Sequence, residues 1–287
     1  FKQKTAYEIK ECDWSSDVCS SDLMALAVAS GGEVLQWKAS TPRSVLYCDG
    51  EMDRSDLIER FASLAHAVEP QVSGAGFARL HLLARDLHDP SASFPDLGTP
   101  EGQAVLLEHA KQTGAALVIL DNLSTLATVE DENSAAAIKP VLDLIQKLRQ
   151  AGCATLLVHH SDKGGKNYRG SSNLATTFAW VLGLTPTKES PCGAMDVTLE
   201  WHKTRNGANA ATVPKRLRLV GEGKACRWEV GESADHQAKA LAQAIRSRGY
   251  INLAGAGEAI GIKQARAYEV KKAMFAAGLM DPAEVAR

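Results

Sequence analysis

The stretch Ala115–Leu126, with the sequence AALVILDNLSTL, constrains the fold of this chain more than any other segment. Its Leu-Val-Ile-Leu run is too short for a membrane span and suits a strand buried on both faces, as in the middle of a parallel sheet. Asp121 follows directly, and the carboxyl ends of parallel strands form the edge where open α/β sheets bind ligands. The pattern fits either a metal-binding acid or a simple Asp-Asn turn, and the rest of the chain has to decide.

Strand and helix patterns alternate on both sides of this stretch. Short apolar runs at 45–48 and 154–160 predict two more buried strands, and helical spacing covers 53–64 and 134–150. Thr99-Pro100-Glu101 is a helix start with a capping residue and proline at the first position. This alternation is the mark of an α/β fold with a mostly parallel sheet flanked by helices.

The carboxyl-terminal third has a different pattern. Segments 197–203 and 215–220 predict an antiparallel hairpin, and Arg227–Val230 an edge strand. From Asp235 the chain is alanine-rich, with helices expected at 235–248, 253–260 and 262–277. We expect a small winged-helix-like domain over 235–287, or alternatively a helical packing domain.

Residues 1–23 are expected to be foreign to the fold, and the alternative is an unusual but natural amino terminus. Lys2–Glu8 and Asp13–Leu23 resemble a translated adapter of short-read sequencing libraries, so we predict that 1–23 is an artefact and that 24–231 is an amino-terminally truncated core. Residues 24–287 carry equal numbers of basic and acidic side chains, so any DNA-binding site must be local. No membrane segment or signal peptide is evident, and the cysteine pattern favours the cytoplasm.

Polar residues at three predicted strand ends should meet at one edge of the sheet. Glu51 follows the strand at 45–48, Asp121 follows the central strand, and His159 and His160 close a third. Phosphoanhydride hydrolysis needs a metal on the phosphates, a group that orients water, and cations near the γ-phosphate. Asp121 suits Mg²⁺, Glu51 suits water activation, and either histidine could sense the γ-phosphate.

Four motifs in this order resemble the RecA-like ATPase core of hexameric helicases, with the RepA-type group of AAA-family ATPases as the nearest match. They are YCDGEM, ALVILDNLSTL, LLVHHSDKGGKNYRGSS and HKTRNG. The resemblance spans about 24–230. It implies Glu51 as the catalytic glutamate, Asp121 as the Walker B acid and His160 (or His159) as the sensor, with Asn122 beside the bound ATP.

The resemblance also implies partners. Lys203 and Arg205 match a lysine-x-arginine element that reaches the γ-phosphate held by the neighbouring subunit of a homo-oligomeric, hexameric ring. A solvated hairpin pair is the alternative. Single-stranded DNA would meet the loop carrying Lys163, Lys166 and Arg169, which could equally be a plain surface loop.

The carboxyl-terminal helices offer a second DNA-binding candidate. Lys263, Arg266 and Lys271 lie around a possible helix-turn-helix, although a solvated helix face would look similar. The expected function is therefore an ATP-driven replicative DNA helicase of a plasmid or phage. The alternatives are a RecA-like regulatory ATPase that does not unwind DNA, and a DNA-binding regulator.

One departure from the family is serious. The phosphate loop G-x-x-x-x-G-K-[ST] does not occur in the sequence, and neither Gly31-Gly32 nor Gly164-Gly165-Lys166 replaces it. In relatives this loop precedes the helix that ends near Ser30. We therefore expect that the full-length protein carries a phosphate loop upstream of Met24 and that the present chain binds ATP poorly and is inactive.

Overall fold

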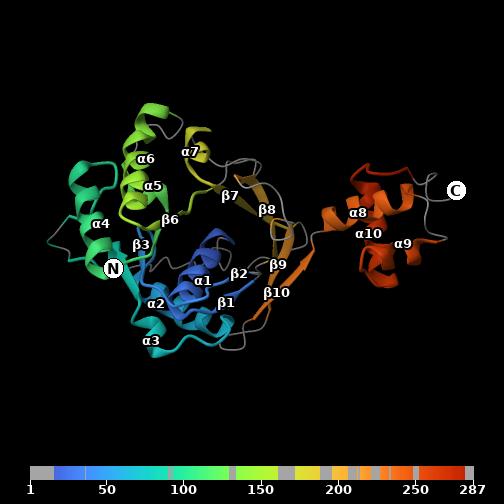
Figure 1. The fold of residues 1–287 in the computed structure, drawn as a ribbon, viewed down its shortest axis with the longest axis horizontal. Coiled ribbons are helices and arrows are strands. Elements are labelled where there is room, and N and C mark those ends of the chain that lie inside the picture. The colour runs from blue at the N-terminus through green and yellow to red at the C-terminus, as the bar shows by residue number, and fades with distance from the viewer. Residues whose placement is uncertain are drawn as a thin grey trace, which may run out of the picture.

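A computed structural model gives the fold of the chain (Figure 1). It describes residues 16–281 except 36, 90, 92, 129–133, 161–171, 188–195, 206–211, 213, 221–226, 233 and 248–251. The expected α/β architecture is present, with a parallel sheet between two layers of helices, an antiparallel sheet and a carboxyl-terminal group of helices. Within the described residues, no helix combines the length and the apolar character needed to cross a bilayer.

The parallel sheet has four strands in the order β4-β3-β5-β6. Their bounds are β3 Val45–Asp49, β4 Leu80–Ala84, β5 Leu117–Asp121 and β6 Ala154–Leu157. The central strands β3 and β5 are almost entirely buried, as their continuous apolar runs predict. Their register pairs Asp49 with Asp121, which sets two carboxylates side by side where the strands end.

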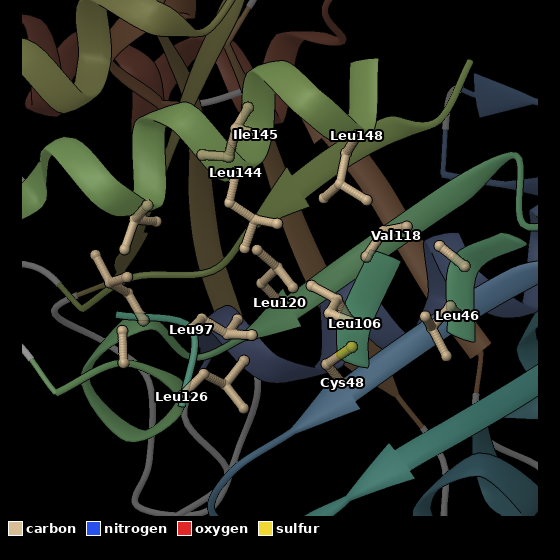
Figure 2. Packing of buried hydrophobic residues seen from close by; sticks show 14 of the residues in the cluster. Leu46, Cys48, Leu97, Leu106, Val118, Leu120, Leu126, Leu144, Ile145 and Leu148 are labelled. Atoms are coloured by element: carbon tan, nitrogen blue, oxygen red, sulfur yellow. The ribbon is translucent and has the colours of Figure 1, made fainter. Parts of the chain in front are cut away.

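Alternate residues of the strands face two separate cores. Leu46 and Leu120 point toward α4 (Pro100–Thr113) and α6 (Ala135–Gln150), where they meet Leu106 and Leu144 (Figure 2). Helix α4 begins as predicted, because the Thr99 hydroxyl accepts a hydrogen bond from the Gly102 N–H. This apolar layer fixes the back of the sheet and leaves its carboxyl edge free for polar groups.

The opposite face of the sheet is covered by α1 (Ser16–Ser30) and α2 (Arg54–Leu64). Leu26 of α1 and Phe61 of α2 pack there against Tyr47 and Ile119. Helix α1 ends at the predicted glycine stop, and Gly31 adopts a φ of 71°. Helix α1 therefore places its amino-terminal half next to the carboxyl edge of β5.

Residues 16–23 belong to helix α1, and Ser21, Asp22 and Leu23 are buried, so this part of the segment that was expected to be foreign packs within the fold. The origin of residues 1–23 stays a prediction.

A second sheet is antiparallel, in the order β10-β9-β8-β7. Its strands are β7 Trp180–Pro186, β8 Asp196–Thr204, β9 Lys215–Val220 and β10 Arg227–Glu232. The predicted hairpin corresponds to β8 and β9, and the predicted edge strand to β10. A small separate hairpin joins β1 (Glu33–Val34) to β2 (Trp37–Lys38).

Helices α8 (Ala234–Arg246), α9 (Leu253–Ala259) and α10 (Gln264–Ala276) form the carboxyl-terminal group. They share a core of their own around Leu241, Ala267 and Met274. Figure 1 draws this group at the red end of the chain. Since its described part holds helices and no strand, the wing of a winged helix stays a prediction.

The remaining short elements lie in the connections. They are α3 Gly74–Phe77, α5 Leu123–Leu126, α7 Ser172–Thr177, and the 3-10 turns η1 Ala65–Ala67 and η2 Arg85–Leu87. One prediction needs correction, because β6 ends at Leu157 rather than at His160. Only Val158 continues the ladder, through a 3.0 Å hydrogen bond from its N–H to the carbonyl of Leu120. Both histidines are therefore outside the strand.

Candidate functional site at the carboxyl edge of the parallel sheet

Asp121 is a buried carboxylate at the end of β5, with a side chain that points toward α1. The residue is 4% exposed. Its Oδ2 atom accepts a 2.5 Å hydrogen bond from the Tyr47 hydroxyl and a 3.3 Å bond from the Ser21 hydroxyl. Burial raises the pKa of Asp121 to about 6, and the neighbouring Asp49 adds to this rise while the Tyr47 hydrogen bond opposes it. The peptide bond that follows Asp121 is cis.

Asp49 organises the turn that carries Glu51. One of its carboxylate oxygens accepts hydrogen bonds from the N–H groups of Glu51, at 3.0 Å, and Met52, at 2.8 Å. Burial raises the pKa of Asp49, although these two backbone donors oppose the rise. The N–H of Gly50 also donates to the carbonyl of Asp121 at 2.9 Å, so the ends of β3 and β5 are tied together.

A third acid lies beneath these two. Asp22 of α1 is fully buried, and its nearest cation is Arg60 of α2, with 3.5 Å between Nη1 and Oδ2. Burial raises the pKa of Asp22 to about 7, and the positive charge of Arg60 works against this rise. The edge of the sheet therefore holds three carboxyl groups with raised pKa values around one arginine.

Asn122 joins two of the predicted catalytic residues. Its Nδ2 atom is 2.7 Å from Oε2 of Glu51 and 3.1 Å from Nε2 of His160. The three strand ends thus converge at one point, as the alternating pattern predicts. The sequence left open which histidine is involved, and the Asn122 contact is made by His160 rather than His159.

Arg85 ties the same turns together from the outside. Its guanidinium donates to the carbonyl of Gly50 at 3.3 Å and to the carbonyl of Thr125 at 2.6 Å, and it stacks over the Phe94 ring at 4.6 Å. A hollow of about 480 Å³ lies beside it, lined by Arg85, Phe94, Asp96 and residues 124–128. Arg85 therefore connects this hollow to the turn that carries Glu51.

Lys203 and Arg205 lie at the end of β8, in the antiparallel sheet. The Lys203 ammonium donates to the carbonyl of Thr176 in α7 at 3.0 Å, and the N–H of Arg205 donates to the carbonyl of Ala179. Neither cation is joined to Glu51 or Asp121 by a hydrogen bond or ion pair within the described part of the chain. Their expected role across a subunit interface stays a prediction.

The predicted DNA-binding residues fall into two groups. Lys163, Lys166 and Arg169 lie outside the described residues. Lys263 is exposed just before α10, whereas Arg266 is partly buried and pairs with Gln237 at 3.0 Å and with Glu269 at 2.8 Å. Lys271 lies 5.6 Å from the centre of the Phe275 ring.

The residues at the carboxyl edge of the parallel sheet are better suited to binding Mg²⁺ than to binding a triphosphate. Asp121 offers a carboxylate, which is an oxygen ligand of the kind that Mg²⁺ takes. Among the described residues, no group of three or more Asp, Glu, His or Cys side chains is arranged to hold a metal ion. The sequence lacks the phosphate-loop motif with its lysine, so the residues of this chain do not supply a backbone cradle for the phosphates.

The fold and the edge define an α/β protein of the nucleotide-hydrolase type, with strand-end acids grouped around a buried polar network. Residues 21–166 match the model of a protein family described as an AAA domain. This match covers half of the chain, which therefore belongs to the AAA domain family, a family of ATPases of the AAA/RecA-like kind. None of the curated proteins matches it.

Sequence reasoning missed several residues of this network. Tyr47 was read only as part of an apolar strand, although it lies two residues before Asp49 and must share a face with it. Arg60 sits at helical spacing among apolar residues of α2, which marks it as a buried cation that needs an acid. Arg85 gave no signal, because its partners are backbone carbonyls far away in the sequence.

Proposed function

We propose that this protein is the core of an ATP-hydrolysing motor that acts on DNA, of the RepA-type replicative helicase group of plasmids or phages. Membership of the AAA domain family supports the ATPase. The observation that carries the proposal is the contact of the Asn122 amide with both Glu51 and His160, next to Asp121. The helicase assignment rests on the motif resemblance.

Each residue at the edge has a role in this proposal. Asp121 holds Mg²⁺, which supplies charge neutralisation on the phosphates when it is bound. Glu51 takes a proton from water, which a carboxylate in a turn at the sheet edge can reach. His160 responds to the terminal phosphate, and Lys203 and Arg205 act from the neighbouring subunit of a ring.

The test uses a form of the protein that carries a phosphate-loop motif. We expect Mg²⁺-dependent ATP hydrolysis that is stimulated by single-stranded DNA, and a loss of at least about 100-fold in kcat for Glu51→Gln. Glu59→Gln, an exposed acid on α2, is the matched control and should leave kcat unchanged. Full DNA-stimulated hydrolysis in Glu51→Gln would refute the catalytic assignment.

Strand displacement separates the helicase from a motor that does not unwind DNA. A forked duplex should be opened only when ATP and Mg²⁺ are both present. ATP hydrolysis without strand displacement would favour the regulatory ATPase instead.

A second candidate is a DNA-binding regulator that works through its carboxyl-terminal helices. The packing of α8, α9 and α10 around one core favours it, since three helices with a short turn before the last suit a helix-turn-helix. Duplex binding that survives Glu51→Gln but is lost in Lys263→Ala with Lys271→Ala would support this candidate.

A further inference from the structure

The side-chain amide of Asn122 has its orientation fixed by its partners. Its Nδ2 atom faces the Glu51 carboxylate at 2.7 Å, and a carboxylate can only accept there. Its Oδ1 atom faces the N–H of Thr125 at 3.3 Å, and an N–H can only donate. Turning the amide over would set oxygen against oxygen and nitrogen against nitrogen, so only one orientation satisfies both partners.

This orientation determines the tautomer of His160. Nδ2 of Asn122 is 3.1 Å from Nε2 of His160, and an amide nitrogen has only hydrogens to offer. Nε2 must therefore be the accepting nitrogen, and the proton of the neutral ring must be on Nδ1. The two hydrogens of one amide group then serve Glu51 and His160 at the same time.

We propose that Asn122 is a positioning residue that couples His160 to Glu51, an inference that rests on the proposed ATPase. A phosphate oxygen can be bound by Nε2 only when this nitrogen carries a proton, and a protonated Nε2 cannot accept from the amide. Binding of phosphate by Nε2 therefore breaks the contact between Asn122 and His160. Asn122, with its bond to Glu51, is then free to shift.

The alternative is that Asn122 only caps the short helix α5. Its side chain does accept from the Thr125 N–H, which is a capping contact. The residue is 2% exposed, however, and the cap uses only Oδ1, which leaves the two Nδ2 contacts unexplained. Two substitutions separate these roles. Asn122→Ser keeps a good capping residue, and Asn122→Asp keeps the shape and the accepting oxygen, but neither can donate to both partners.

The tautomer is measured on the full 287-residue chain without nucleotide, by NMR of ¹⁵N-labelled histidine at a pH where the rings are neutral. His160→Gln identifies the His160 signals. We expect the Nδ1–H form in the unchanged chain and a shift toward the Nε2–H form in Asn122→Ser and Asn122→Asp. If Asn122→Ser does not fold, Asn122→Asp carries the same test.

Asn252 provides a matched control. It caps α9 by accepting a 2.9 Å hydrogen bond from the Gly255 N–H, in the carboxyl-terminal group of helices. Asn252→Ser makes the same chemical change at a helix cap and should leave the His160 signals unchanged. An unchanged tautomer in both Asn122 variants, or an equal change in Asn252→Ser, would overturn the proposal.

The kinetic arm uses a form of the protein that carries a phosphate-loop motif and hydrolyses ATP. Asn122→Ser should lower kcat about tenfold or more with little change in KM for ATP. In the double variant, Asn122→Ser with His160→Gln, kcat should fall by much less than the product of the two single effects, because both substitutions break the same coupling. An unchanged kcat would overturn the positioning role. The NMR arm needs no ATP, so its result stands even if the proposed function fails.

Discussion

The phenol of Tyr47 donates a 2.5 Å hydrogen bond to Asp121 across the β3–β5 pair, inside a core where Tyr47 has no exposure to solvent. The ring packs edge-on against Phe61, with 5.2 Å between the ring centres. Tyr47 thus orients Asp121, the buried acid that is proposed to hold Mg²⁺, from inside the hydrophobic core. Second partners of this kind fix the geometry of metal ligands.

Replacing Tyr47 with Phe should raise the pKa of Asp121 above about 6, because the phenol hydrogen bond is one of the contacts that lower it. The free energy of unfolding should fall by about 1 kcal/mol, since a buried acceptor loses its donor while the ring contact with Phe61 is kept. Carboxyl ¹³C NMR titration and urea unfolding measure the two effects. Tyr268→Phe, at an exposed position on α10, should change neither. An unaltered Asp121 titration would show that the bond is not formed in solution.

The free energy of unfolding should decrease as the pH rises through the folded pKa of Asp121. The folded pKa of Asp121 is about 6, against the ordinary value of 3.8 for an aspartate, so the folded state binds more protons than the unfolded state between these pH values. Its contribution is complete below about pH 4 and is lost as the pH rises through about 6, a change on the order of 3 kcal/mol. Asp121→Asn, which mimics the protonated acid, should unfold at higher urea than the unchanged chain at pH 8.

The control for this prediction is Asp143→Asn, which removes an acid that is half exposed and pairs with Lys139 on α6. It should alter the unfolding free energy by no more than about 0.5 kcal/mol at either pH. Equal pH profiles for Asp121→Asn and the unchanged chain would mean that Asp121 ionises normally in the folded state.

The effect of removing Arg60 should depend mainly on the presence of Asp22. Arg60→Leu leaves Asp22 buried without the cation that lowers its pKa, so stability at pH 8 should drop by about 3 kcal/mol. Changing Asp22→Leu at the same time removes the buried carboxyl group and should restore most of the loss. Thermal and urea unfolding of the single and double variants provide the comparison. If the double variant is as unstable as Arg60→Leu, the two side chains do not act as a pair.

Gly50 should not tolerate a side chain. A Cβ atom there would lie 2.8 Å from Cβ of Thr125, closer still to its hydroxyl, and 3.1 Å from Leu126. Gly50→Ala should therefore separate the ends of β3 and β5 and destabilise the fold by about 1 to 3 kcal/mol. Gly74→Ala, where a Cβ atom meets nothing within 4 Å, should be neutral. Equal stability of the two variants would contradict the close approach.

The elements of the parallel sheet were predictable because their patterns are local. Leu117–Asp121 is continuous and apolar, and the cap at Thr99 needs only its own neighbours in sequence. It was also predictable that Glu51 would lie near His160, which follows β6, because the carboxyl ends of parallel strands lie along the same edge of a sheet. What escaped prediction depends on distant partners. The hydrogen bond from Arg85 to the carbonyl of Gly50 and the choice of His160 over His159 follow from packing, which periodicity does not encode. The ion pair of Asp22 with Arg60 was missed because residues 1–23 were expected to be foreign to the fold.

The pairing of Asp49 with Asp121 also limits how the chain can vary in length. Glu51 lies two residues after Asp49, and Asn122 lies one residue after Asp121. The register of β3 with β5 therefore sets the positions of both side chains in the polar network. Inserting one residue within β3 or β5 would rotate every later side chain to the opposite face. Insertions in the crossovers, such as the stretch between α2 and β4, leave the count intact. Natural variants of this protein should therefore differ in length in the crossovers and never inside these two strands.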